Sequence, residues 1–225
     1  MKRPDGSNPK SLGYKFRKKR FEKIERMIRD TLKHQSSVSI LDVGGRRDYW
    51  DYLEDDLHSK THITLVNYET ELSEFTEKNS NLNMTSLIGD GCNMPQFADD
   101  SFDIAHSNSV IEHVGSLSNM IKYADEIRRV GKKYYVQAPY LWFPIDPHFG
   151  MPFIHWLPGP SRALIMHKYK VGFSNTPIKD YREALSEADS IRLVDKALIK
   201  RLFPESKLSK ERFCLLTKSL ICVKN

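Results

Sequence analysis

The sequence has few cysteines, no long apolar run and no internal repeat, and each absence excludes a class of protein. Its three cysteines, Cys92, Cys214 and Cys222, are odd in number and lack the close spacing of a metal site, which favours reduced thiols. No uninterrupted apolar stretch approaches the roughly 18 residues that a membrane span needs. The first residues are charged and polar, so we expect no secretory signal and a cytoplasmic protein.

The excess of basic residues is confined to the N-terminal region of the sequence. The net charge is +6, but residues 1–29 hold eleven Lys or Arg against three acids, which leaves the rest of the chain at about −2. A groove for a nucleic-acid backbone would need basic residues around the active site itself. Nucleic acid is therefore disfavoured as a partner, and a small molecule is favoured.

What is present indicates one ordinary folded domain. The 225 residues are 40% hydrophobic and 28% charged, which is typical of a soluble globular protein. This length suffices for one well-buried core and is short for two. We therefore expect residues 1–225 to form a single domain.

The basic segment 10–34 has apolar residues at helical spacing, namely Phe21, Ile24, Met27, Ile28 and Leu32. The opposite side of this amphipathic helix carries the basic residues Arg17, Lys18, Arg20, Lys23 and Arg29. One interpretation is a helix that covers an edge of the fold and has a solvated charged face. The other is a docking helix for an anionic membrane surface or an acidic partner.

Short apolar runs then alternate with longer amphipathic ones, the pattern of βαβ units. The predicted strands are 39–43, 62–66, 85–88, 102–106 and 133–137, with helices beginning near Asp48, Glu69 and Ser116. Two final apolar runs, 191–198 and 213–223, predict a closing antiparallel hairpin with no helix between them. The expected fold class is α/β: a doubly wound, mostly parallel seven-stranded sheet with helices on both faces.

Residues 139–178 interrupt this alternation. Six prolines between positions 139 and 160 forbid regular helix or central strand there, and six aromatic residues lie within the seventeen positions from Tyr140 to Trp156. A long irregular segment in a compact domain is usually functional or disordered, and this one is too aromatic for disorder. We expect an insert or lid on the substrate side.

Four short motifs follow one another in order. They are Asp42-Val43-Gly44-Gly45, then Gly89-Asp90-Gly91 with Met94-Pro95, then Asp99-Asp100-Ser101-Phe102-Asp103, and then Ser109 to Val114, which contains Glu112-His113. Over residues 38–138 this series resembles the class I S-adenosylmethionine-dependent methyltransferases, in the small-molecule group that includes the ubiquinone and menaquinone enzymes. The stretch 142–158 is in addition similar to one in bacterial methyltransferases of surface-polysaccharide pathways.

The resemblance implies S-adenosylmethionine as cofactor and a set of residues around it. Asp42, Gly44 and Gly45 would hold its methionine part, Asp90, Gly91 and Cys92 its adenine, and Asn108 would face the sulfonium and the substrate. The acid that closes the second strand in the family and binds the ribose is Asn67 here, with Glu69 as the obvious substitute. Arg46 and Asp48 replace the later glycines of the first motif, so Arg46 or Arg47 becomes a further candidate for an anionic group.

Histidines supply the candidate catalytic groups. His148 comes after the fifth strand, and Asp146 is placed to orient its ring as a general base. His113 is the second candidate. The alternative interpretation is structural: in this family's pattern the Glu-His pair stabilises the strand-to-helix junction, and His148 and His155 hydrogen-bond the backbone of the insert. Some quinone methyltransferases carry a Glu-x-x-Glu-His magnesium site here, but Ser109 replaces the first Glu, so we predict no metal. His106 is expected to be a packed core residue.

These features predict methylation of a small molecule or sugar, at an oxygen atom. The alternatives are a nucleic-acid or protein methyltransferase, or a binding protein of the same fold without catalysis. The basic helix and the aromatic insert could also bring the active site to a membrane surface.

Overall fold

A computed structural model describes residues 11–68, 82–172 and 176–225. Its centre is a seven-stranded sheet in the order β3-β2-β1-β4-β5-β7-β6. Strands β1 (Val38–Val43), β2 (Thr61–Asn67), β3 (Asn83–Ile88), β4 (Phe102–Asn108) and β5 (Gly131–Pro139) are parallel. Strand β7 (Leu216–Lys224) runs antiparallel between β5 and β6 (Lys207–Phe213). The predicted fold class is confirmed.

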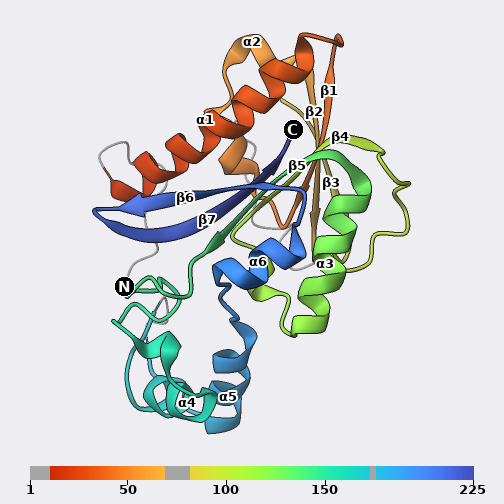
Figure 1. Ribbon diagram of the computed structural model, residues 1–225. Helices are drawn as coiled ribbons and strands as arrows, with labels where there is room; N and C mark the ends of the chain where they lie inside the picture. The colour runs from red at the N-terminus through yellow and green to blue at the C-terminus, as the bar shows by residue number, and fades with distance from the viewer. Residues whose placement is uncertain (1–10, 69–81, 173–175) are drawn as a thin grey trace.

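Alternating side chains of the central strands face two separate cores. Ile40 of β1 packs with Phe21 and Ile24 of helix α1 (Leu12–Leu32), whereas Leu41 packs against helix α3 (Leu117–Val130). This alternation follows from the two-residue period of a strand, which sends successive side chains to opposite faces. Figure 1 shows α1 and α3 on opposite sides of the sheet.

The connections after β1 and β4 begin as helices close to the predicted positions. After β1 comes the 3₁₀ helix η1 (Arg47–Tyr52), followed by the single turn α2 (Asp55–His58). Ser116 caps α3, because its hydroxyl accepts a hydrogen bond from the Asn119 amide at 3.0 Å. The helix expected near Glu69 lies outside the described residues.

The end of the chain differs from the sequence prediction. The predicted strand 191–198 is wrong: Val194 forms only an isolated bridge with Tyr140, and helix α6 (Lys196–Leu202) follows at once. Asp195 begins that helix by accepting a hydrogen bond from the Leu198 amide at 2.8 Å. The first strand of the hairpin is instead β6, which is polar because it is the exposed edge of the sheet, where lysines discourage pairing with another chain.

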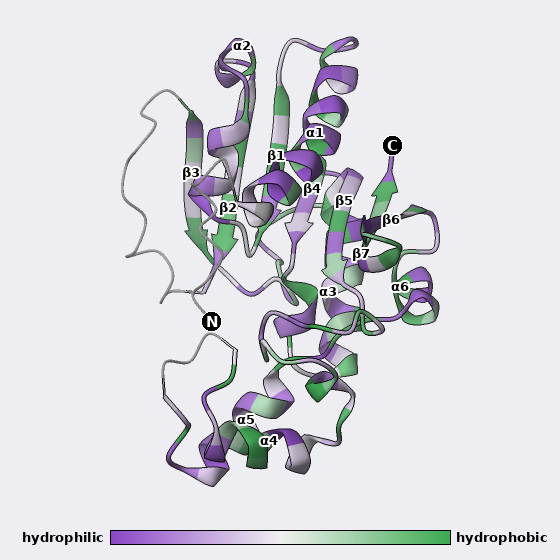
Figure 2. Cartoon of the chain, turned by 90° about the vertical axis from the view of Figure 1, so that its left-hand side faces the viewer, coloured by the Kyte–Doolittle hydropathy of each residue, from purple (hydrophilic) through white to green (hydrophobic). Residues whose placement is uncertain are grey.

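The segment after β5 folds around a small core of its own. It contains the 3₁₀ turn η4 (Ile154–Trp156) and helix α4 (Gly159–Lys168), which packs on helix α5 (Tyr181–Ser190) through Phe149, Ala163 and Ala184. The expectation that prolines forbid a helix here is wrong for α4, since Pro158 and Pro160 sit at its start, where proline is tolerated. Figure 2 shows α4 and α5 beyond the ends to which the parallel strands point.

Candidate cofactor and substrate site

A pocket of about 770 Å³ opens at the carboxyl ends of the parallel strands. Ligands of doubly wound folds bind at this edge, and the volume lies in the range of small-molecule sites. The pocket is lined by residues of β1, β2 and β4, by the loops that follow β1, β3 and β4, by α1, and by His148 of the insert. With Tyr123 of helix α3, the lining residues come from seven separate stretches of the chain.

The first glycine loop is shaped for close approach. Gly44 has a φ of +71°, and a Cβ atom there would lie 2.6 Å from the side chain of Val110. A Cβ atom on Gly45 would lie 1.9 Å from Oδ2 of Asp42. Both positions thus require glycine, although the bulkier Arg46 follows them and pairs with Asp48 at 3.0 Å.

Asp42 lines the pocket, but its carboxylate is held inside the protein. Oδ2 accepts a hydrogen bond from Nε1 of Trp50 at 2.8 Å, and Oδ1 lies 2.6 Å from Nδ1 of His106. The His106 ring is stacked between those of Tyr49 and Tyr135, with centroids 5.1 and 5.2 Å away. His106 is buried, as expected from the sequence, whereas the contribution of Trp50 was not foreseen. This network fixes the end of β1 beneath the glycine loop.

The ends of β2 and β3 offer polar groups to one side of the pocket. Asn67 is buried, and its Nδ2 donates to the carbonyl of Gly45 at 2.8 Å, while Oδ1 has no partner among the described residues. The hydroxyl of Tyr68 donates a hydrogen bond to Oδ1 of Asp90 at 2.9 Å. Burial, followed by the interaction with Asp90, raises the pKa of Tyr68 to about 12. Tyr68 was missed at the sequence level; its position directly after β2 was the available signal. Glu69 lies outside the described residues.

The loop after β3 is pinned around the carboxylate of Asp90. The amide of Cys92 donates to Oδ1 of Asp90 at 2.8 Å. Gly91 leaves no room for a Cβ atom, which would lie 2.6 Å from Val43 and 2.7 Å from Tyr123. The thiol of Cys92 contacts the carbonyl of Asn119 at 3.5 Å, and burial, followed by Asp90, raises its pKa to about 11. The thiol is therefore protonated and serves as a packing group beside the pocket.

Helix α1 contributes Arg17 and Arg20 to the lining of the pocket, and Arg20 is bound to residues of the sheet. Nη1 of Arg20 donates to Oδ1 of Asn108 at 3.0 Å and to Oε1 of Gln137 at 2.8 Å, and Nε lies 3.4 Å from Glu211. Only 12% of the Arg20 side chain is exposed, so the prediction of a solvated charged face is wrong for this residue. Ser109, with a φ of +59°, donates to the same Gln137 oxygen at 2.8 Å.

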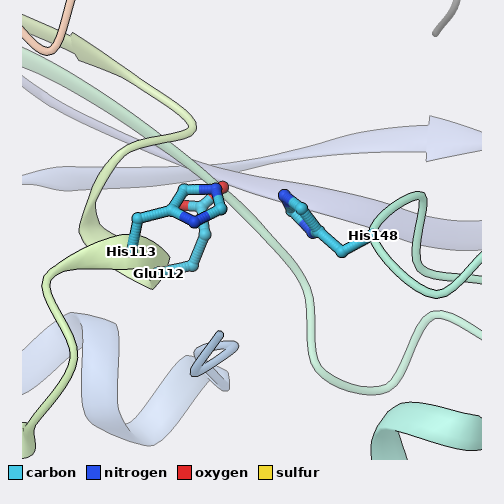
Figure 3. Close-up of side chains that lie close together, drawn as sticks. All are labelled: Glu112, His113 and His148. Atoms are coloured by element: carbon cyan, nitrogen blue, oxygen red, sulfur yellow. The ribbon is translucent and has the colours of Figure 1, made fainter. Parts of the chain in front are cut away.

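The candidate catalytic side chains meet on the insert side of the pocket (Figure 3). Nδ1 of His148 lies 2.8 Å from Oδ1 of the buried Asp146, and the rings of His113 and His148 are 4.7 Å apart. Burial lowers the pKa of His148, but the hydrogen bond and charge of Asp146 outweigh it and hold the pKa above its usual range. Desolvation and His148 lower the pKa of His113 to about 4, so its imidazole is neutral.

Glu112 lies behind these rings and is fully buried. Neither of its carboxylate oxygens has a hydrogen-bond partner in the part of the chain that the structure describes. Burial raises the pKa of Glu112 to about 7, against the opposing charge of His148.

His155 is a structural residue of the insert. Its Nε2 lies 3.0 Å from the carbonyl of Leu141, which also accepts a hydrogen bond from Nε1 of Trp156 at 2.7 Å. The side chain is buried and does not line the pocket. Of the three insert histidines, His148, His155 and His167, His148 alone lines the pocket.

Comparisons with known proteins agree with this geometry. Residues 41–134 match the family described as a methyltransferase domain. No curated protein matches the sequence.

Solved structures give the same answer for the fold. The PH0226 protein from Pyrococcus horikoshii OT3 superposes with a TM-score of 0.54 at 15% identity, over 96% of this chain and 95% of that one. The N-terminal domain of EvdMO1, solved in the presence of SAH and D-fucose, superposes with a TM-score of 0.53 at 14% identity, over 92% of this chain and 80% of that one. The YcgJ protein from Bacillus subtilis superposes with a TM-score of 0.51 at 16% identity, over 85% of this chain and 71% of that one.

The sheet order, the glycine loop and the matched domain define an enzyme of the class I methyltransferase type. The matched domain supports an enzyme that transfers a methyl group, with S-adenosylmethionine as its cofactor.

Proposed function

We propose that this enzyme methylates a hydroxyl oxygen of a small molecule, such as a sugar. The observation that carries the proposal is the Asp146–His148 pair, which is held at 2.8 Å in the wall of the pocket. A hydroxyl is a weak nucleophile until it loses its proton, so this acceptor needs a base, whereas an amine or a carboxylate does not.

The residues around the glycine loop fit the cofactor. Gly44 and Gly45 leave the backbone open to a ligand. Oδ1 of Asn67, which no described residue hydrogen-bonds, is a buried acceptor that a ligand hydroxyl would satisfy. We assign the methionine side to Asp42, Gly44 and Gly45, and the ribose to Asn67 with Glu69. Asp90, Gly91 and Cys92 take the adenine side, and Asn108 faces the reacting centre. When bound, the cofactor supplies an activated methyl group on its sulfonium.

The chain itself has to align the acceptor and take its proton. Asp146 holds Nδ1 of His148 protonated, which leaves Nε2 as the basic atom that accepts the hydroxyl proton. The neutral His113, whose ring centroid lies 4.7 Å from that of His148, is the second polar contact for the acceptor. The insert shields this side of the pocket from water, and so strengthens the electrostatic interactions inside it.

The charges around the pocket favour a small acceptor over a nucleic acid. Three arginines line it, but Arg20 is bound to Glu211, and Arg17 and Arg46 both pair with Asp48, at 3.8 and 3.0 Å. A nucleic-acid groove needs cations that remain available to phosphates.

The insert also supports peripheral contact with an anionic membrane surface. Three of its aromatic side chains form an exposed cluster: Trp142, Phe153 and Trp156 are 57%, 52% and 41% exposed. The Trp156 ring lies 5.8 Å from that of Trp142 and 4.9 Å from that of Phe153. Tryptophan is enriched where a bilayer meets water. Among the described residues, no helix has the length and apolarity to span a membrane.

The central test measures methyl transfer to defined acceptors. Wild type is given S-adenosylmethionine with a radiolabelled methyl group and separate panels of sugars, amines and carboxylic acids. We expect label in an alkali-stable ether of a hydroxylated acceptor, and its loss in His148→Gln but not in the surface control His34→Ala. Label confined to amines or to alkali-labile esters would refute O-methylation, and full activity of His148→Gln would refute the assigned base.

A further inference from the structure

The cluster around Glu112 has the composition of a metal site. One ligand atom each of Glu112, His113 and His148 lies within 4.8 Å of the others, and the side chains come from two separate segments of the chain (Figure 3). Glu112 and His113 belong to the short turn η3 (Ile111–His113), whereas His148 belongs to the insert. Two imidazoles and one carboxylate around an open position are the ligands of many catalytic zinc and iron sites.

Glu112 itself lacks the partner that a buried carboxylate needs. It is fully buried, and both oxygens are without hydrogen bonds in the described part of the chain. Burying such a group is costly unless it is paired or coordinates a metal. The ligand atoms of His113 and His148 lie within 4.8 Å of this carboxylate, and a cation held between the three groups would satisfy it.

The surroundings of His148 are those of a metal ligand. Its Nδ1 is bound to Asp146 at 2.8 Å, and one of its ring nitrogens lies within 4.8 Å of ligand atoms of Glu112 and His113. Metal-binding histidines almost always give their second ring nitrogen to a carboxylate, a carbonyl or water, and this contact fixes the ring. Asp146 is therefore an outer-shell residue of the same site.

We propose that Glu112, His113 and His148 bind one divalent transition-metal ion of the zinc type. The sequence predicts no metal here because Ser109 removes one carboxylate, but the fold supplies His148 from the insert in its place. Magnesium does not suit this set, because it prefers oxygen ligands in octahedral geometry. His113 and His148 line the pocket, so an open coordination position would face the acceptor.

This inference rests on the proposed function only through His148, since Nε2 cannot bind a metal and accept a proton at once. With the ion bound, an acceptor hydroxyl that coordinates it would have its pKa lowered by the metal. Without the ion, His148 remains the base. Metal binding and methyl transfer are therefore measured separately.

The test uses untagged full-length protein stripped with a chelator, in a Cys214→Ser background because that thiol is exposed. Calorimetry with Zn²⁺ alone should give one site, with much weaker binding of Mg²⁺. Glu112→Gln and His148→Ala should abolish the site, Asp146→Asn should weaken it by about 10- to 100-fold, and the exposed His34→Ala should leave it unchanged. Co²⁺ should give visible absorption bands that His148→Ala loses.

Absence of a Zn²⁺ site in the wild type, or an unchanged site in Glu112→Gln, would overturn the metal inference. Circular dichroism of each stripped variant shows whether a lost site reflects unfolding, and His148→Gln is the replacement if His148→Ala does not fold. If the wild type binds no Zn²⁺ but His148→Gln loses methyl transfer, the metal site is refuted and the assignment of His148 as the base stands. If the wild type binds Zn²⁺ and His148→Gln keeps full activity, the assignment of His148 as the base is refuted and the metal site stands.

Discussion

Arg20 in helix α1 and Asn108 at the end of β4 are joined by a hydrogen bond of 3.0 Å between Nη1 and Oδ1. The same nitrogen donates to Gln137 on β5. One side chain thus ties the basic helix to the ends of the two central strands, in the lining of the pocket. The helix is part of the site, and not only a cover for the sheet.

Removal of that side chain should destabilise the protein. Arg20→Ala removes one of the two donors to Oε1 of Gln137 and the ion-pair partner of the buried Glu211, and loss of one partner of a buried ion pair typically costs about 3–5 kcal/mol. We expect urea denaturation to show a fall of about 3 kcal/mol in the free energy of unfolding. Lys18→Ala, on the exposed side of the same helix, should stay within about 0.5 kcal/mol of wild type. Equal effects of the two variants would contradict an inward role for Arg20.

The glycine loop offers a second test with a matched control. In Gly45→Ala the new methyl group would meet the carboxylate of Asp42, which is fixed by Trp50 and His106 and cannot move away. We expect the dissociation constant of S-adenosylhomocysteine, measured by calorimetry, to rise at least tenfold, which is about 1.4 kcal/mol. In Gly159→Ala the nearest atom to the added methyl is 4.0 Å away, so binding should not change. Unaltered affinity in Gly45→Ala would remove the loop from the cofactor site.

The parts of the fold that the sequence predicts are those set by local pattern. Strands β1 to β5 have apolar runs between turn residues, and Ser116, a favourable N-cap residue, indicates the start of α3. Strand β6 gives no such signal, because an edge strand buries little, and the apolar run 191–198 is divided between an isolated bridge and the helix that Asp195 caps.

The site was predictable as far as it follows from topology. Parallel strands bring their carboxyl ends to one edge, so the sequence could group Asp42, Asn67, Asp90 and Asn108 there. The distances between separate elements were not predictable. Nothing in the spacing of Arg20 indicates Gln137, 117 positions later, and nothing in Glu112-His113 indicates that the insert returns His148 to them.

Asp103, the last residue of the third motif, should give the stability of the protein a dependence on pH. Its Oδ2 accepts hydrogen bonds from the amide and hydroxyl of Ser39 at 2.9 Å, and Oδ1 pairs with Lys132 at 2.9 Å. Burial raises the pKa of Asp103, but these hydrogen bonds outweigh it and hold the pKa below its usual range. The carboxylate therefore stabilises the fold above the pKa of about 3.9 in the unfolded chain, and this stability is lost as pH falls through the lower folded value.

The measurement compares variants at two pH values. Asp103→Asn should lower the free energy of unfolding at pH 7 by about 2 kcal/mol, the size of a hydrogen-bonded charge, and the difference from wild type should shrink towards pH 3. Asp100→Asn, at an exposed position of the same motif, should have little effect at either pH. A deficit of Asp103→Asn that is as large at pH 3 as at pH 7 would show that shape, and not charge, matters at this position.

The aromatic cluster of the insert predicts binding to anionic lipid. Trp142, Phe153 and Trp156 expose large apolar surfaces next to one another, and transfer of such surface into a bilayer interface is favourable. Co-sedimentation with vesicles that contain phosphatidylserine should fall at least tenfold, which is about 1.4 kcal/mol, when all three are changed to serine. Leu215→Ser, which removes a side chain that is 91% exposed at the β6–β7 turn, should bind as wild type does. Equal binding to neutral and anionic vesicles would exclude a contribution of the basic helix, and no binding to either would exclude the membrane surface altogether.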